Sequence, residues 1–240
     1  MQWSHLSGKD YNPISASRPG TDNPTSAVPA GLYQFEIGTN YYGGPGNVYK
    51  TPTFPMLLRM GVFNNTELQV GYSNKYATLG LLYGGISFIN GLENSIHFTT
   101  SLLMPIDGIS STDNSDSLTE FSVHLPISYS FQNGFSVWGQ VAETVFNNDK
   151  LDPIRKYSMA LGSRLGNKTN WFFEAYKSQI IGNEIPIENI PISIDFGITY
   201  LVENNIQFDL SMGLTFQKDD SYYIETERFI EWGLSFRLPE

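Results

Sequence analysis

The sequence predicts an all-β protein: a single twelve-stranded antiparallel up-and-down transmembrane β-barrel over residues 31–240, preceded by an extended tail over residues 1–30. Three observations support this prediction. Apolar and polar residues alternate through one segment after another, tight turns alternate with long loops, and the composition is unusual. Charged residues are only 16% of the chain, whereas aromatic residues reach 14%. Soluble proteins typically carry about 25% charged residues, so this composition favours a barrel in lipid.

The alternation is clearest in residues 206–216, which read Ile-Gln-Phe-Asp-Leu-Ser-Met-Gly-Leu-Thr-Phe. A period of two places successive side chains on opposite faces of a sheet. The apolar face of such strands either packs inside a soluble β-sandwich or faces lipid around a polar interior. A soluble secreted sandwich is therefore an alternative to the barrel, and it requires the aromatic faces to pack on each other.

The tail is proline-rich, with Pro13, Pro19, Pro24 and Pro29 among many Ser, Thr, Asn and Asp residues, which is typical of an extended segment. From Gly31 onward the sequence predicts strands over residues 31–42, 48–63, 66–73, 76–89, 94–104, 119–131, 135–146, 155–165, 169–180, 189–201, 206–216 and 227–238. Most are long enough to cross a bilayer when tilted, which takes about 9–11 residues. Pro55 and Pro126 fall inside these strands, so we expect a bulge or a wider gap near each. The facing of residues 80–85 is not determined, because they keep no single alternation.

The connections alternate in length. Tight turns rich in Asn and Gly lie at residues 64–65, 90–91, 132–134, 166–168 and 203–205, and longer links lie at 43–47, 105–118, 147–154, 181–188 and 217–226. Only the short link at 74–75 breaks the rule. Bacterial outer-membrane barrels have short periplasmic turns and longer extracellular loops. Because an even number of strands returns the chain to its starting side, we expect both termini in the periplasm.

Several classes of protein are disfavoured by composition. No run of about 18 uncharged apolar residues exists, so a transmembrane helix is not expected. The net charge of −10 argues against binding to nucleic acid. The chain has no cysteine, and hence no disulfide or thiolate metal site. It begins Met1-Gln2-Trp3 without a basic or apolar leader, so we expect that any signal peptide has been removed or never existed.

The C-terminal strand carries a motif. Glu231, Gly233, Phe236 and Leu238 keep a fixed spacing of one polar, one glycine and two hydrophobic positions. This spacing resembles the C-terminal recognition signal of outer-membrane barrels. The resemblance implies that Gly233, Phe236 and Leu238 form an assembly signal for the barrel-assembly machinery, with outer-membrane lipid around the strands.

The beginning of the chain carries a second resemblance. Ser17-Arg18-Pro19-Gly20 is followed by Asn23-Pro24, by Val28-Pro29-Ala30-Gly31 and by Gln34-Phe35-Glu36-Ile37-Gly38. This order is similar to the opening of the outer-membrane barrel family named for the meta-pathway of phenol degradation, whose members are described as transporters. Thr66-Glu67-Leu68-Gln69-Val70-Gly71 resembles the third strand of that family. The matched motifs cover about the first third and the last strand, and they imply fold and location more than substrate.

If the apolar faces meet lipid, the polar faces line the interior. The residues predicted there are Gln34, Glu36, Asn40, Arg59, Glu67, Gln69, His97, Glu120, Ser122, His124, Arg164, Glu174, Asp195, Asp209, Glu231 and Arg237. Unpaired charge in a narrow lumen is costly, so we expect the arginines to bridge neighbouring carboxylates. Arg237 is expected to reach Glu36 once the last strand closes on the first.

Two functions fit such an interior. One is a channel or transporter for small solutes, including cations or hydrophobic and aromatic molecules, which is the function that the family resemblance favours. The other is a non-conducting barrel that serves as a structural or accessory subunit of a larger outer-membrane complex. A further hypothesis is that residues 1–30 form a partial plug, with Arg18 pairing with acidic residues.

Catalysis, cofactors and metals are not expected. Nucleophilic catalysis needs a hydroxyl within reach of a base, and the only histidines of the strands, His97 and His124, fall on the inward polar face. No Gly-x-Ser-x-Gly, phosphate-loop or His-Glu-x-x-His motif occurs. The long loops are acidic and could hold calcium, but no spacing matches an EF-hand, so we expect them to be solvated.

Overall fold

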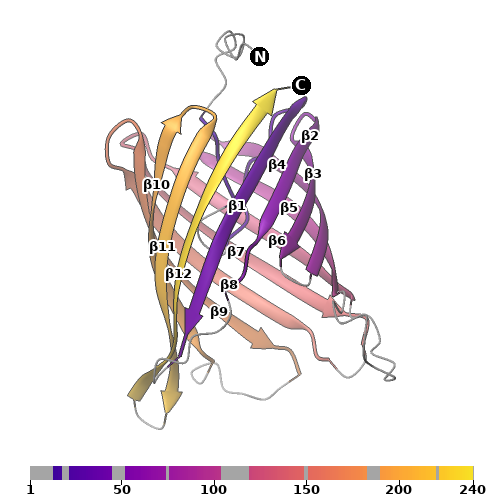
Figure 1. The fold of residues 1–240 in the computed structure, drawn as a ribbon, viewed down its shortest axis with the longest axis vertical. Helices are drawn as coiled ribbons and strands as arrows, with labels where there is room; N and C mark the ends of the chain where they lie inside the picture. The colour runs from indigo at the N-terminus through magenta and orange to yellow at the C-terminus, as the bar shows by residue number, and fades with distance from the viewer. Residues whose placement is uncertain are drawn as a thin grey trace.

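In the computed structural model the chain forms one closed barrel of twelve antiparallel strands, each paired with its neighbours in chain order (Figure 1). The structure describes residues 13–17, 22–44, 52–73, 76–103, 119–148, 151–182, 190–219 and 222–239. The strands are β1 (Leu32–Gly43), β2 (Met56–Phe63), β3 (Thr66–Ser73), β4 (Tyr76–Ile89), β5 (Leu92–Leu103), β6 (Thr119–Ser130), β7 (Phe135–Phe146), β8 (Ile154–Arg164), β9 (Thr169–Ile180), β10 (Ile192–Glu203), β11 (Ile206–Asp219) and β12 (Tyr222–Pro239). The predicted fold class is confirmed.

Two regions, the beginning of β2 and the β11–β12 hairpin, differ from the predicted strands for physical reasons. β2 begins at Met56, so Pro55 precedes the strand and does not lie inside it. Proline has no N–H to donate to a ladder, and Pro55 contributes only its carbonyl, which accepts from the Gly38 N–H at 3.0 Å. The link predicted at 217–226 is also wrong, because β11 and β12 pair out to Asp219 opposite Tyr222. A shift of register at Thr215 and Phe216 lets this hairpin extend.

The other irregular positions lie where the sequence placed them. Beside Pro126, the ladder between β5 and β6 is interrupted from Asn94 to His97, which confirms the expected gap. The pairing of β4 with β5 shifts register between Gly84 and Ile86. Between them Gly85 has φ of 76°, a conformation that glycine adopts without strain. Residues 80–84 do keep one alternation, with Leu82 buried inside, so the expected break is wrong there and lies only at Gly85.

The barrel has polar side chains inside and apolar side chains outside. Gln34, Arg59, Asp209 and Ser235 are at most 1% exposed, whereas Met212, on the opposite face from Asp209, is 54% exposed. A soluble sandwich buries its apolar faces between two sheets, so this single closed sheet with an apolar outer surface excludes that alternative. No helix in the described part of the chain is long and apolar enough to cross a membrane.

The first and last strands close the barrel, and the beginning of β1 lies beside the end of β12. β1 and β12 pair from Leu32 opposite Pro239 to Gly43 opposite Arg228. Figure 1 shows the end of β12 and the beginning of β1 together at one end of the barrel, with the short β2–β3 turn beside them. In that turn Asn65 has φ of 61°, which asparagine tolerates better than most residues. The predicted asparagine turn therefore adopts the conformation that a tight hairpin needs.

Candidate functional site

The described residues that precede β1 lie within the barrel and bind its inner wall; we call residues 13–17 and 22–31 the inner segment (Figure 1). Its backbone N–H groups are bound by inward carboxylates. The Ser17 N–H donates to both oxygens of Glu36 at 3.0 and 3.1 Å, and the Val28 N–H donates to Glu67 Oε2 at 2.6 Å. The Thr25 carbonyl in turn accepts from the Gly85 N–H of the β4 bulge at 2.6 Å. Charged acceptors make such hydrogen bonds strong, so the segment is held firmly.

Arg59 on β2 is at the centre of this network. Its Nε lies 2.6 Å from Glu67 Oε1 and its Nη1 lies 3.2 Å from Glu36 Oε1, and all three side chains are buried. The same guanidinium donates to the Ser15 carbonyl at 2.8 Å and to the Ser26 carbonyl at 3.2 Å. A planar fork of five donors permits this simultaneous binding. One side chain therefore fixes both halves of the inner segment, and the expectation that arginines bridge carboxylates is confirmed for Arg59.

Amide side chains extend the network. Arg237 on β12 donates to Gln34 Oε1 from Nη2 at 3.0 Å, and Gln34 Nε2 donates to Glu36 Oε1 at 2.8 Å. On β3, Gln69 Nε2 donates to Glu67 Oε1 at 2.5 Å. The predicted approach of Arg237 to Glu36 is thus made through Gln34.

The inner segment also reaches the opposite wall. Asp22 accepts a short hydrogen bond from the Ser158 hydroxyl and lies 3.9 Å from Lys156 Nζ, both on β8. The Asn23 N–H donates to Gln140 Oε1 on β7 at 3.0 Å. Burial, followed by the charge of Glu174, raises the pKa of Asp22 to about 7. The segment therefore spans the lumen from β1–β3 to β7–β8.

The predicted lumen residues divide by burial. His124 is half-buried and Arg164 is exposed. Asn40 and Glu120 are also half-buried. The remaining predicted residues are at most 9% exposed: Gln34, Glu36, Arg59, Glu67, Gln69, His97, Ser122, Glu174, Asp195, Asp209, Glu231 and Arg237. Their role in lining a pore stays a prediction. Arg18 and most of the acidic loop residues lie outside the described residues.

The structure brings some of these residues together on the sheet. Asp195 on β10 lies directly opposite Glu174 on β9. Asp195 is 2% exposed, and neither of its carboxylate oxygens accepts a hydrogen bond from the described residues. His97 and His124 lie opposite each other on β5 and β6 with ring centroids 5.2 Å apart. His97 Nε2 is 3.0 Å from Thr99 Oγ1, so this imidazole has an ordinary structural partner.

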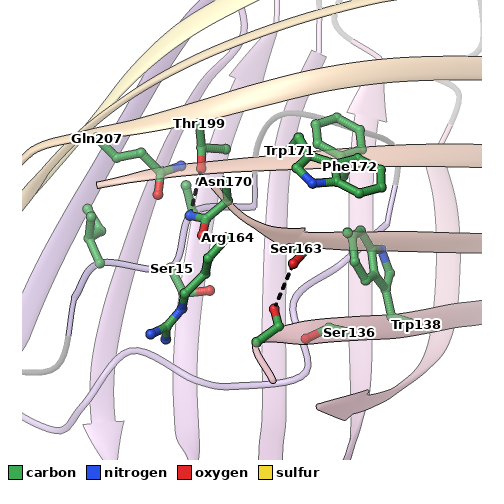
Figure 2. Close-up of a pocket in the computed structure, with 14 residues that line it drawn as sticks. Ser15, Ser136, Trp138, Ser163, Arg164, Asn170, Trp171, Phe172, Thr199 and Gln207 are labelled. Atoms are coloured by element: carbon green, nitrogen blue, oxygen red, sulfur yellow. Dashed lines mark hydrogen bonds between the residues drawn. The ribbon is translucent and has the colours of Figure 1, made fainter. Parts of the chain in front are cut away.

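Two of the cavities lined by described residues lie between the inner segment and the wall. The first, which we call the Arg164 cavity, is about 310 Å³ and is lined by Arg164 and by polar side chains such as Asn170 and Thr199 (Figure 2). The second, the Glu174 cavity, is about 330 Å³ and is lined by Asp22, Glu93 and Glu174. Trp138 and Phe172 line both cavities. The inner segment therefore leaves space along the wall formed by β5–β11.

Sequence reasoning missed these two inward aromatic residues. The alternation contained the signal, because Trp138 stands between inward Ser136 and Gln140, and Phe172 stands between inward Asn170 and Glu174. The predicted interior contains polar side chains only, although the position of these two aromatic residues in the period of two places them inside.

Comparisons with known proteins show the same fold. No family model and no curated protein matches the sequence. Among solved structures, the KdgM porin in complex with disordered oligogalacturonate has a TM-score of 0.59 at 8% identity, over 85% of this chain and 98% of that one. An outer-membrane channel from Pseudomonas putida F1 has a TM-score of 0.58 at 10% identity, over 92% and 100%. The CymD monoaromatic hydrocarbon channel has a TM-score of 0.54 at 10% identity, over 89% of both chains.

This chain has the fold of outer-membrane porins and channels. At such low identity the likeness concerns the fold alone. The resemblance to the family of the phenol-degradation pathway stays a prediction.

Proposed function

We propose that this protein is an integral channel of a bacterial outer membrane for small solutes, with both termini in the periplasm. Its fold is shared with porins, its outer surface is apolar, and its lumen is polar. The observation that carries the proposal is the space that remains beside the inner segment, since cavities of about 310 and 330 Å³ flank it along one wall. The inner segment thus acts as a partial plug that narrows the passage.

The charge of the Glu174 cavity supports a preference among solutes. Asp22, Glu93 and Glu174 line the Glu174 cavity, and none of its described lining residues is basic. Rings of carboxylates favour cations and repel anions. We therefore propose that neutral and cationic solutes pass more readily than anions such as the oligogalacturonate bound by the KdgM porin. The aromatic faces of Trp138 and Phe172 support passage of hydrophobic or aromatic molecules, the class that CymD carries.

Conductance in planar bilayers tests the channel and the plug together. The purified full chain is expected to give small, cation-preferring conductance, and deletion of residues 2–28 is expected to increase it. Heat-modifiable migration on a gel, measured for both proteins, establishes that each barrel is folded. A folded deletion variant with unchanged conductance would contradict the plug, and a folded chain without conductance in either form would contradict the channel.

The alternative function is a non-conducting subunit of a larger envelope complex. It is favoured by the strength of the network around Arg59, which binds the inner segment through the Ser15 and Ser26 carbonyls and holds it across the lumen. Absence of conductance in the full chain, together with co-purification of a defined partner from outer-membrane extracts, would establish this alternative.

A further inference from the structure

The Glu174 cavity combines two features that are rarely found together in a polar lumen. It is large enough for a small organic molecule, at about 330 Å³, and it is lined both by aromatic rings and by carboxylates. Trp138 and Phe172 supply the rings, and Glu93 on β5 and Glu174 on β9 supply the carboxylates. Both aromatic faces and carboxylates attract cations.

The rings lie against the barrel wall because glycines make room for them. A Cβ at Gly197 would lie 2.2 Å from the Phe172 ring, and a Cβ at Gly162 would lie 3.0 Å from Trp138 Cη2. Each ring therefore covers a glycine on a neighbouring strand. The ring centroids are 6.5 Å apart with the planes inclined at 50°, so the two rings form an aromatic corner (Figure 2). The negative face of an aromatic ring attracts a cation placed over it.

The carboxylates lie beside this corner. Glu174 follows Phe172 by two residues on β9, so both side chains project from the same face of the sheet. Glu174 is 1% exposed. On β5, Glu93 accepts a weak hydrogen bond from Thr25 Oγ1 at 3.4 Å. Glu93 and Glu174 both line the cavity, so a cation bound there would be attracted by two carboxylates.

The charge around the cavity is consistent with this ligand. Asp22 is the third acidic residue that lines the cavity. Lys156 Nζ lies 3.9 Å from Asp22 Oδ1 and 5.0 Å from the centroid of the Tyr176 ring, and Lys156 is not among the described residues that line the cavity. Among the described residues that line the Glu174 cavity, the charged side chains are therefore all acidic, whereas Arg164 lines the other cavity that these rings share.

A metal ion does not fit this arrangement. Within the described ranges, no group of three or more His, Cys, Asp and Glu side chains is placed to hold one. Carboxylates together with ring faces suit a larger cation with an apolar surface. A quaternary ammonium ion has this shape, because its charge is spread over methyl groups that contact aromatic faces well.

We propose that the Glu174 cavity binds a small quaternary ammonium ion, with its methyl groups against Trp138 and Phe172 and its charge toward Glu93 and Glu174. Binding of this ion depends only on the cavity. Its passage through the barrel depends in addition on the proposed channel function.

Choline and 3,3-dimethyl-1-butanol distinguish charge from shape, because the alcohol has the same form with a neutral carbon in place of nitrogen. Titration calorimetry on the full chain in detergent is expected to show choline binding roughly tenfold or more tightly than the alcohol. Equal affinities, or no binding of choline, would overturn the proposal. This comparison uses the unaltered protein, so it does not depend on the folding of any variant.

Variants then locate the site. Trp138→Leu and Glu174→Gln are each expected to weaken choline binding by roughly three- to thirtyfold. Trp232→Leu is the matched control, since Trp232 is 43% exposed on the outer surface, and it should bind as the unaltered chain does. A folded Trp138→Leu variant with unchanged affinity would overturn the assignment. If the barrel binds choline but does not conduct, the binding site would be supported and the proposed channel function would be contradicted.

Discussion

Arg59 Nε and Glu67 Oε1 lie 2.6 Å apart across the β2–β3 hairpin, and both side chains are no more than 1% exposed. This pair would be costly to bury alone. It is sustained because the Ser15 and Ser26 carbonyls and the Val28 N–H complete the hydrogen bonds of the two groups. The inner segment and the ion pair therefore stabilise each other.

Removing the cation should be severely destabilising. In Arg59→Met, the carboxylates of Glu36 and Glu67 stay buried without their main partner, which should lower the free energy of unfolding by about 3–5 kcal/mol. Urea unfolding in detergent micelles, followed by tryptophan fluorescence, measures the change. Arg155→Met is the matched control, because it also breaks an arginine–glutamate pair, but Arg155 and Glu143 are 41% and 43% exposed. A similar loss in both variants would contradict the special role of Arg59.

The recess behind Phe172 should be sensitive to a single methyl group. A Cβ at Gly197 would lie 2.2 Å from the ring, so Gly197→Ala should destabilise the barrel by about 1–3 kcal/mol through overpacking. When combined with Gly197→Ala, Phe172→Leu should relieve much of the loss of stability. A double-mutant cycle in the same unfolding assay would show this as a coupling energy between the two positions. Gly44→Ala is the control, since the nearest atom to its Cβ would be 3.8 Å away. Additive effects of the two changes would contradict the contact.

Docking of the inner segment should weaken as the pH rises toward neutrality. The pKa of Asp22 is raised from 3.8 to about 7 by burial and by Glu174, so the docked segment holds a proton that the undocked segment releases. By linkage, docking is most stable below about pH 4, weakens between about pH 4 and 7, and is constant above. Lys156, 3.9 Å away, moderates but does not reverse this direction.

Hydrogen exchange of residues 22–31, corrected for its intrinsic pH dependence, measures this docking. Protection at pH 5 is expected to exceed protection at pH 8. The same comparison in Asp22→Asn should show a smaller difference, because the amide does not titrate. An equal difference in both proteins would assign the pH dependence to another group.

The C-terminal strand should govern assembly in the cell more than stability in detergent. Phe236 stacks on Phe35 with ring centroids 5.2 Å apart, where β12 closes on β1. Phe236→Ala is expected to reduce the amount of folded protein in the outer membrane several-fold, while the purified chain still refolds in detergent. Phe208→Ala, another apolar change on a neighbouring strand, is the control. Equal losses in cells for both variants would contradict a recognition role for Phe236.

The fold could be read from the sequence because its determinants are local. A period of two assigns each side chain to a face, and the asparagine and glycine turns set the hairpins, so strands such as β3 and β7 have the boundaries that were predicted. The structure differs from the predicted strands in two places. β2 begins only after Pro55, which has no N–H to donate, and the β11–β12 hairpin pairs beyond a register shift at Thr215 and Phe216. Both depend on how two strands match, which the periodicity of one strand does not contain.

The site was only partly predictable. The inward carboxylates and arginines follow from alternation alone, and the sequence by itself determined that this protein is a barrel with a polar interior. Only the tertiary structure decided that the inner segment crosses the lumen from Arg59 to Ser158, because contacts between residues so distant in the chain exist only after closure. It likewise decided that Trp138 and Phe172 share a cavity with Glu174, since these rings from β7 and β9 meet across β8, where Gly162 has no side chain to separate them.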